Sequence, residues 1–164
     1  MELQGSRVAA DCRFAIVVSR FNAEITEGLL AGARRALAEA QVSDQNVAIV
    51  RVPGSFEIPL VAARLADTGA FDAVICIGCL IKGDTMHFEY IASATSQGIM
   101  DASAASGVPI AFGVLTTLTE EQAYARAVDG PDNKGREAAL AAVEMATLFR
   151  KLLETDFSPD AGER

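Results

Sequence analysis

The chain of 164 residues is 51% hydrophobic and carries a formal net charge of −8, with a pI near 4.6. This length suits one globular domain with a buried core, and the acidic balance without a basic stripe argues against a nucleic-acid surface. The longest apolar run, residues 70–81, is interrupted by Asp72 and is too short to span a bilayer, so no membrane segment is expected.

Strand-like and helical segments alternate along the sequence. Four runs rich in Val and Ile and apolar on both faces are typical of strands that helices cover on both sides. In chain order we predict a strand at 14–19, a helix at 23–40, a strand at 47–52, a helix at 57–67, a strand at 73–77, a helix at 86–106, a strand at 109–115, a short helix begun by the capping box Thr119–Gln122, and a helix at 135–153.

This alternation predicts one domain over residues 1–164, with an N-terminal arm at 1–12 and a flexible tail at 155–164. The fold class is α/β: a three-layer α/β/α sandwich around a four-stranded parallel sheet with flavodoxin-like winding. In such sheets, ligands bind outside the carboxyl ends of the strands. The segments expected there are Ser19–Asn22, Pro53–Glu57, Gly78–His87 and Thr116–Thr119.

The first two of these segments offer contacts for a flat polar ligand. Phe21 directly follows a strand; alone it is better explained as packing against the helix entry, and its alternative is a stacking surface for a ring. In the second segment, Gly54 lets a ligand approach the backbone, and Ser55 and the first-turn amides offer donors. Glu57 either holds a ligand or complements the helix dipole.

The third segment favours a phosphate. Two glycines separated by four residues suggest a nucleotide-binding P-loop, but Asp84 stands where its lysine should be, so we exclude a nucleotide triphosphatase. Gly83 and Thr85 precede a helix start, where free amides and a hydroxyl suit an anion. His87 is the only histidine. A single histidine is more often a packed or solvent-facing residue than a catalyst, but beside a phosphate it can exchange protons with a substrate.

Cations and an aromatic follow the fourth strand. Phe112 lies on that strand, and Arg126 either interacts with the end of its helix or clamps a phosphate. The chain has three lysines, Lys82, Lys134 and Lys151. None lies clearly in an apolar pocket at a strand end, so a Schiff-base mechanism is not favoured.

The cysteines and the N-terminus indicate a cytoplasmic protein. The N-terminus has no charged start followed by an apolar stretch, so no signal peptide is predicted. Three cysteines, an odd number, form no disulfide framework. Cys76 and Cys79 make a C-x-x-C, but Cys12 and His87 stand at no zinc-ligand spacing from them, and no metal site is expected.

Four motifs, in order between residues 14 and 153, resemble the 6,7-dimethyl-8-ribityllumazine synthase family: Ser19–Asn22, Val52–Pro59, Ile81–Tyr90 and Phe112–Thr116. The resemblance implies a transferase of riboflavin biosynthesis without a cofactor. Its reaction would condense 5-amino-6-(D-ribitylamino)uracil with 3,4-dihydroxy-2-butanone 4-phosphate, releasing phosphate and two waters. The alternatives are a non-catalytic assembly that binds and stores flavin or lumazine and, less favoured, a structural shell protein.

The resemblance also implies a role for each site residue. Phe21 would stack on the pyrimidine, His87 would move protons, and Phe112, Arg126 and Lys134 would come from a neighbouring subunit. The ribityl chain would be held by Ser55, Phe56 and Glu57, the uracil edge by the backbone of Cys79, Leu80 and Ile81, and the phosphate by Gly83, Asp84, Thr85 and Arg126.

The implied assembly is a homopentamer with active sites at its subunit interfaces. An association with riboflavin synthase and a larger 60-subunit shell stay open. The turn at residues 128–132, where pentamers of the family meet in shells, has the length of shell-forming members but not their residues. Leu118 also departs from the family pattern, and we expect little effect from it.

Overall fold

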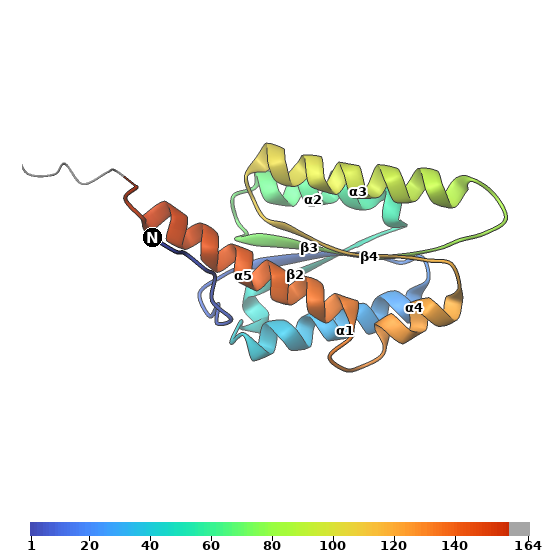
Figure 1. The fold of residues 1–164 in the computed structure, drawn as a ribbon, viewed down its shortest axis with the longest axis horizontal. Coiled ribbons are helices and arrows are strands. Elements are labelled where there is room, and N and C mark those ends of the chain that lie inside the picture. Colours follow the sequence, from blue (N-terminus) through green and yellow to red (C-terminus); the bar gives the residue numbers. More distant parts are fainter. Residues whose placement is uncertain (158–164) are drawn as a thin grey trace, which may run out of the picture.

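A computed structural model of the chain describes residues 1–157 and places a parallel sheet between two layers of helices (Figure 1). The strand order is β2-β1-β3-β4, which confirms the predicted flavodoxin-like winding. The strands are β1 (Phe14–Ser19), β2 (Val47–Val52), β3 (Ala73–Ile81) and β4 (Ile110–Thr117). One face is covered by α1 (Ala23–Glu39), α4 (Glu120–Ala127) and α5 (Lys134–Glu154), and the other by α2 (Ile58–Asp67) and α3 (His87–Ser106).

The central strands are buried on both sides, whereas the edge strands are not. Every residue of β1 and the first seven residues of β3 are buried. The prediction that all four strands are covered on both faces is wrong for β2, where only Val52 is buried and Ile49 is 38% exposed. The reason is position, because β2 and β4 each have a strand neighbour on one side only.

The third strand is longer than its sequence predicts, since it runs on past residue 77 to Ile81. It continues because β4 pairs with it as far as the Ile81–Thr117 register. Gly78 lies within this extension, and a β-carbon there would meet the Ser55 Oγ at 2.6 Å. The glycine therefore lets the loop after β2 approach the sheet closely.

The observed ends of the four long helices lie within one residue of the predicted ones. Residues 55–57 form a short 3-10 turn, η2 (Ser55–Glu57), before α2, and a second turn, η1 (Asp44–Asn46), precedes β2. Thr119 caps α4 by accepting from the Gln122 N–H at 3.2 Å. The return bond of a capping box is displaced by one residue, because the Gln122 side chain accepts from the Leu118 N–H.

The N-terminal arm lies beside the C-terminal half of α5 (Figure 1). There the Ser6 N–H donates to the Thr147 Oγ1 at 2.7 Å and Lys151 donates to the Gln4 carbonyl. Residues 158–164 of the predicted tail lie outside the described residues. Within residues 1–157, no helix is both long enough and apolar enough to cross a membrane.

Helices α1 and α5 touch through glycine. A β-carbon on Gly135 would lie 2.5 Å from the Leu29 carbonyl carbon and closer still to its oxygen. Neither partner is a flexible side chain, so the two backbones would have to move apart.

We therefore expect Gly135→Ala to lower the free energy of unfolding by about 1–3 kcal/mol, as overpacking does. Urea denaturation of the two proteins measures this. Alanine is intrinsically the better helix residue by roughly 1 kcal/mol, so an unchanged or higher stability would contradict the close approach.

Candidate active site

A cavity of about 440 Å3 opens at the carboxyl edge of the sheet, where β1, β2 and β3 end. We call it the loop cavity. Its position is the one expected for a ligand site in an open α/β sheet. Of the predicted site residues, ten line it: Phe21, Ser55, Phe56, Glu57, Cys79, Leu80, Ile81, Gly83, Thr85 and His87. Asp84 belongs to the same turn as Gly83 but does not line the cavity.

The loop after β1 holds an aromatic ring open to solvent. Phe21 is 68% exposed, and its N–H donates to the Pro53 carbonyl at 3.1 Å. Asn22, which follows it, has a left-handed backbone with φ 57°. The Asn22 Nδ2 donates to the Cys79 carbonyl at 2.9 Å, which ties this loop to the end of β3. Sequence reasoning missed Asn22; its tolerance of left-handed backbone was the available signal.

The loop after β2 is closed by its own residues. The Glu57 Oε2 accepts from the Gly54 N–H at 2.9 Å. Ser55 is buried, and its carbonyl accepts from the buried Thr95 hydroxyl at 3.2 Å. Phe56, by contrast, is 59% exposed beside the cavity. The loop thus presents an exposed ring and a carboxylate from a backbone that is fixed from beneath.

The end of β3 offers its backbone rather than its cysteine. Cys79 packs its side chain with the core under α1, whereas Cys76 lies in the core under α2 and α3. The two thiols are therefore on opposite faces of the sheet and cannot bind one ion together. Across the described part of the chain, no group of three His, Cys, Asp or Glu residues could hold a metal ion.

The turn that leads into α3 is rich in free donors. Residues 83–87 are exposed, and α3 begins at His87, in the helical turn that the sequence predicts. In this turn none of the backbone N–H groups from Gly83 to His87 donates a hydrogen bond within the described chain. Met86, at the N-cap, supplies no side-chain cap. These amides, with the Thr85 hydroxyl beside them, can bind an anion.

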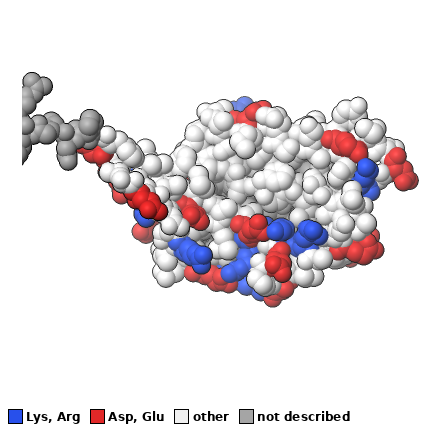
Figure 2. Space-filling view, in the orientation of Figure 1, with Lys and Arg blue, Asp and Glu red and all other residues white. Residues whose placement is uncertain are grey.

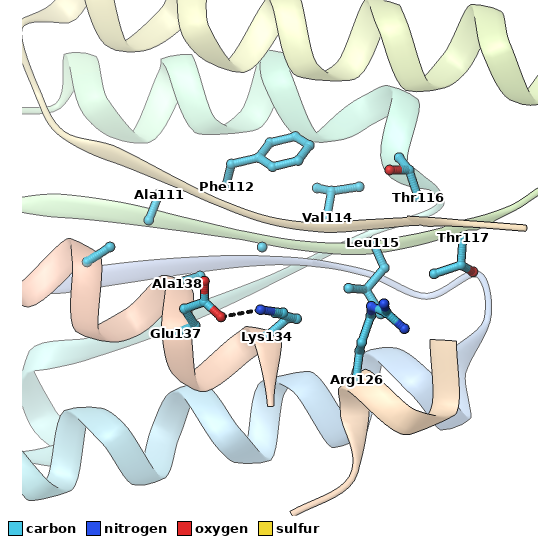
Figure 3. A pocket seen from close by; sticks show the side chains of 12 residues that line it. Ala111, Phe112, Val114, Leu115, Thr116, Thr117, Arg126, Lys134, Glu137 and Ala138 are labelled. Atoms are coloured by element: carbon cyan, nitrogen blue, oxygen red, sulfur yellow. Dashed lines mark hydrogen bonds and ion pairs between the residues drawn. The ribbon is translucent and has the colours of Figure 1, made fainter. Parts of the chain in front are cut away.

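A second cavity, of about 400 Å3, runs along the outer edge of β4 and is called the edge cavity. It contains Phe112, Arg126 and Lys134 (Figure 3). In that view Phe112 extends from one side of β4, while Arg126 from α4 and Lys134 from α5 approach from the other. Lys134 pairs with Glu137, and the Arg126 Nη1 donates to the Gln122 carbonyl at 2.9 Å.

The two cavities share no lining residue. The chain therefore brings Phe21, the Ser55–Glu57 loop, the end of β3 and His87 together, but it does not bring Phe112, Arg126 or Lys134 to them. Their assignment to a neighbouring subunit stays a prediction.

Asn133 holds together the helices that carry the cations of the edge cavity. Sequence reasoning missed this residue too. It is 2% exposed. Its Nδ2 lies 2.8 Å from the Ala127 carbonyl and 3.1 Å from that of Gly28, and its Oδ1 accepts from the Arg136 N–H. One side chain thus joins α1, the end of α4 and the start of α5, and so sets where Arg126 and Lys134 stand.

These observations define a class: a flavodoxin-like α/β protein with one ligand cavity at the carboxyl edge of its sheet and a cationic cavity along an open strand. The model of the 6,7-dimethyl-8-ribityllumazine synthase family matches residues 11–150. A 6,7-dimethyl-8-ribityllumazine synthase of Salinibacter ruber is 50% identical over 150 residues, which cover 92% of this chain and 96% of that protein. The chain therefore belongs to the 6,7-dimethyl-8-ribityllumazine synthase family, a family of transferases in riboflavin biosynthesis.

Both β3 thiols titrate above their usual range. Burial raises the pKa of Cys79 from 9.0 to about 11, and burial raises the pKa of Cys76 further. The unfolded chain then loses these protons at lower pH than the folded chain does, so stability falls as pH rises from about 9 towards 11.

Replacing both cysteines by alanine should make this fall shallower, by up to about 1.4 kcal/mol per pH unit for each thiol. Urea denaturation at pH 8, 9, 10 and 11 measures the slope for both proteins. Identical slopes would mean that these thiols ionise as readily in the folded chain as in the unfolded one.

Proposed function

We propose that the chain condenses 5-amino-6-(D-ribitylamino)uracil with 3,4-dihydroxy-2-butanone 4-phosphate to give 6,7-dimethyl-8-ribityllumazine, phosphate and two waters. The observation that carries the proposal is the loop cavity, where an exposed ring, the fixed loop that carries Glu57, the backbone at the end of β3 and a turn of free amides converge. Together they match a substrate pair with a flat ring, a polyol chain and a phosphate. The reduced state of the three cysteines also suits the cytoplasm.

Within the loop cavity we assign the aminouracil to the inner part. Phe21 stacks on its ring, and the backbone of Cys79 to Ile81 hydrogen-bonds its edge. Glu57 receives ribityl hydroxyls beside Ser55 and Phe56. The fit is supported by the exposure of both phenylalanine residues, 68% for Phe21 and 59% for Phe56. Stacking of a flat ring on such a face is favourable beyond the area that it buries.

The phosphate belongs at the turn before α3. Gly83, Asp84 and Thr85 contribute main-chain amides and the Thr85 hydroxyl, and the start of a 20-residue helix adds its positive end. Arg126 supplies a two-donor clamp, and Lys134 with Phe112 closes the ring end, all three from a second subunit. His87, on the exposed first turn of α3, transfers protons during imine formation and phosphate loss.

The main task of the protein in this reaction is to position the two substrates. An amine condenses with a ketone without a cofactor, so holding both substrates in attack position is the main contribution, worth up to about 7–11 kcal/mol. General acid–base transfer by His87 adds about a hundredfold or more.

A closed ring of subunits, a homopentamer, completes the site. Support comes from the unpaired outer edge of β4, whose free backbone groups another chain can cover. Figure 2 shows the same face with its charged side chains mainly over α1, α4 and α5, and few over α3 and β4. Each subunit would then give its edge cavity to the loop cavity of the next, in head-to-tail contact.

The test is to mix the purified protein with both substrates and to follow lumazine fluorescence together with released phosphate. We expect both signals in equal amounts. A protein that binds added lumazine but releases no phosphate from the substrates would be a storage assembly, and the proposal would be wrong.

In the same assay, Arg126→Ala should raise the KM for the phosphorylated substrate by about tenfold or more, because a charge-assisted bond to phosphate is lost. The KM for the aminouracil should change little. His87→Ala is the comparison, since it should lower kcat while leaving measurable turnover. An unchanged KM in Arg126→Ala would remove Arg126 from the phosphate site.

A further inference from the structure

An ion pair spans the turn that we assign to the phosphate. Lys82 directly precedes the turn, and its N–H donates to the Thr117 carbonyl at 2.9 Å, which fixes it to β4. Glu89 lies two residues after His87, in the first turn of α3. The Lys82 Nζ is 3.2 Å from the Glu89 Oε1. Neither residue lines the loop cavity.

Glu89 occupies a position from which a carboxylate usually caps its own helix. It is the third residue of α3 after the N-cap Met86, and a glutamate there commonly accepts from the N-cap N–H. Glu57 makes this bond at the corresponding position of η2, on Gly54. Glu89 does not make it. Within residues 1–157 the Met86 N–H donates no hydrogen bond, and the Glu89 Oε2 is buried without a hydrogen-bond partner.

A carboxylate and a phosphate would compete for these amides. Both are anions that bind free N–H groups at a helix start, and they repel each other at short range. The pKa of Glu89 is lowered by its own backbone N–H and then by the Lys82 ammonium, so the side chain stays ionised at neutral pH. Without a restraint, the carboxylate would be an intramolecular competitor of the substrate phosphate.

We propose that Lys82 is a positioning residue that holds the Glu89 carboxylate away from the amides of the phosphate turn and leaves them free for the substrate. The proposal rests on the proposed function, since it concerns the same phosphate. It assigns Lys82 a role through Glu89 rather than through contact with either substrate.

Three variants test it: Lys82→Met, Glu89→Gln and the two combined. Lys82→Met frees the carboxylate and should raise the KM for the phosphorylated substrate about fivefold, the upper range for an exposed ion pair, with little change for the aminouracil. Glu89→Gln should leave that KM near the wild-type value. The combined variant should return to it, because a neutral amide neither repels the phosphate nor competes with it as an anion. Lys151→Met is the matched control, since Lys151 contacts the N-terminal arm.

Three results would overturn the proposal. The first is that Lys82→Met raises the KM by the same factor in the wild-type background and in the Glu89→Gln background. Lys82 would then bind the phosphate itself. If Glu89→Gln, Lys82→Met and their combination all raised it alike, the pair would only brace the turn. An unchanged KM in every variant would also refute it. Binding of inorganic phosphate to the same variants, followed by 31P NMR, separates these results from a failure of the proposed reaction, because it needs no turnover.

Discussion

The open outer edge of β4 is the constraint on which the site depends. In the order β2-β1-β3-β4, the strands β1, β2 and β3 deliver their loops to one cavity, while β4 lies last and turns its free side outward. Arg126 and Lys134 gather along that side. A cation that neutralises a phosphate has to stand within a few ångströms of it. Under the proposed function, this topology would make one chain half of a catalytic unit and leave the second half to a neighbouring subunit.

Buried polar contacts hold each half in shape before any ligand arrives. Asn22 links the loop after β1 to the end of β3, and Asn133 joins three helices behind the edge cavity. Gly78 gives the Ser55 loop room to lie against the sheet. Such fixed backbones matter in the proposed reaction, because orienting two substrates would be most of what the protein supplies. In our proposal the Lys82–Glu89 pair has a related role, because it keeps a carboxylate away from the backbone N–H groups that would bind the phosphate.

Much of this could be predicted from the sequence, and the exceptions have physical reasons. Helix and strand periodicity predicted the elements and their winding, and three of the four segments predicted at the strand ends form the loop cavity. The fourth, Thr116–Thr119, instead contributes Thr116 and Thr117 to the edge cavity, because β4 lies at the edge of the sheet. The extension of β3 to Ile81 depends on pairing with β4, which a local pattern cannot reveal. The roles of Asn22 and Asn133 depend on carbonyls 57 and 105 residues away. Asp84 lies in the predicted turn without lining the loop cavity, and its contact with the phosphate stays a prediction.

The most direct test of the account is complementation between the two halves of the site. Phe21→Ala damages only the loop cavity, and Arg126→Ala damages only the edge cavity. When both variants are co-expressed, about a quarter of the sites in mixed rings should pair an intact loop cavity with an intact edge cavity. Lumazine synthesis by the mixed oligomer should then clearly exceed the mean of the two separate variants. Activity no higher than that mean, in rings shown to contain both chains, would contradict a site shared between subunits.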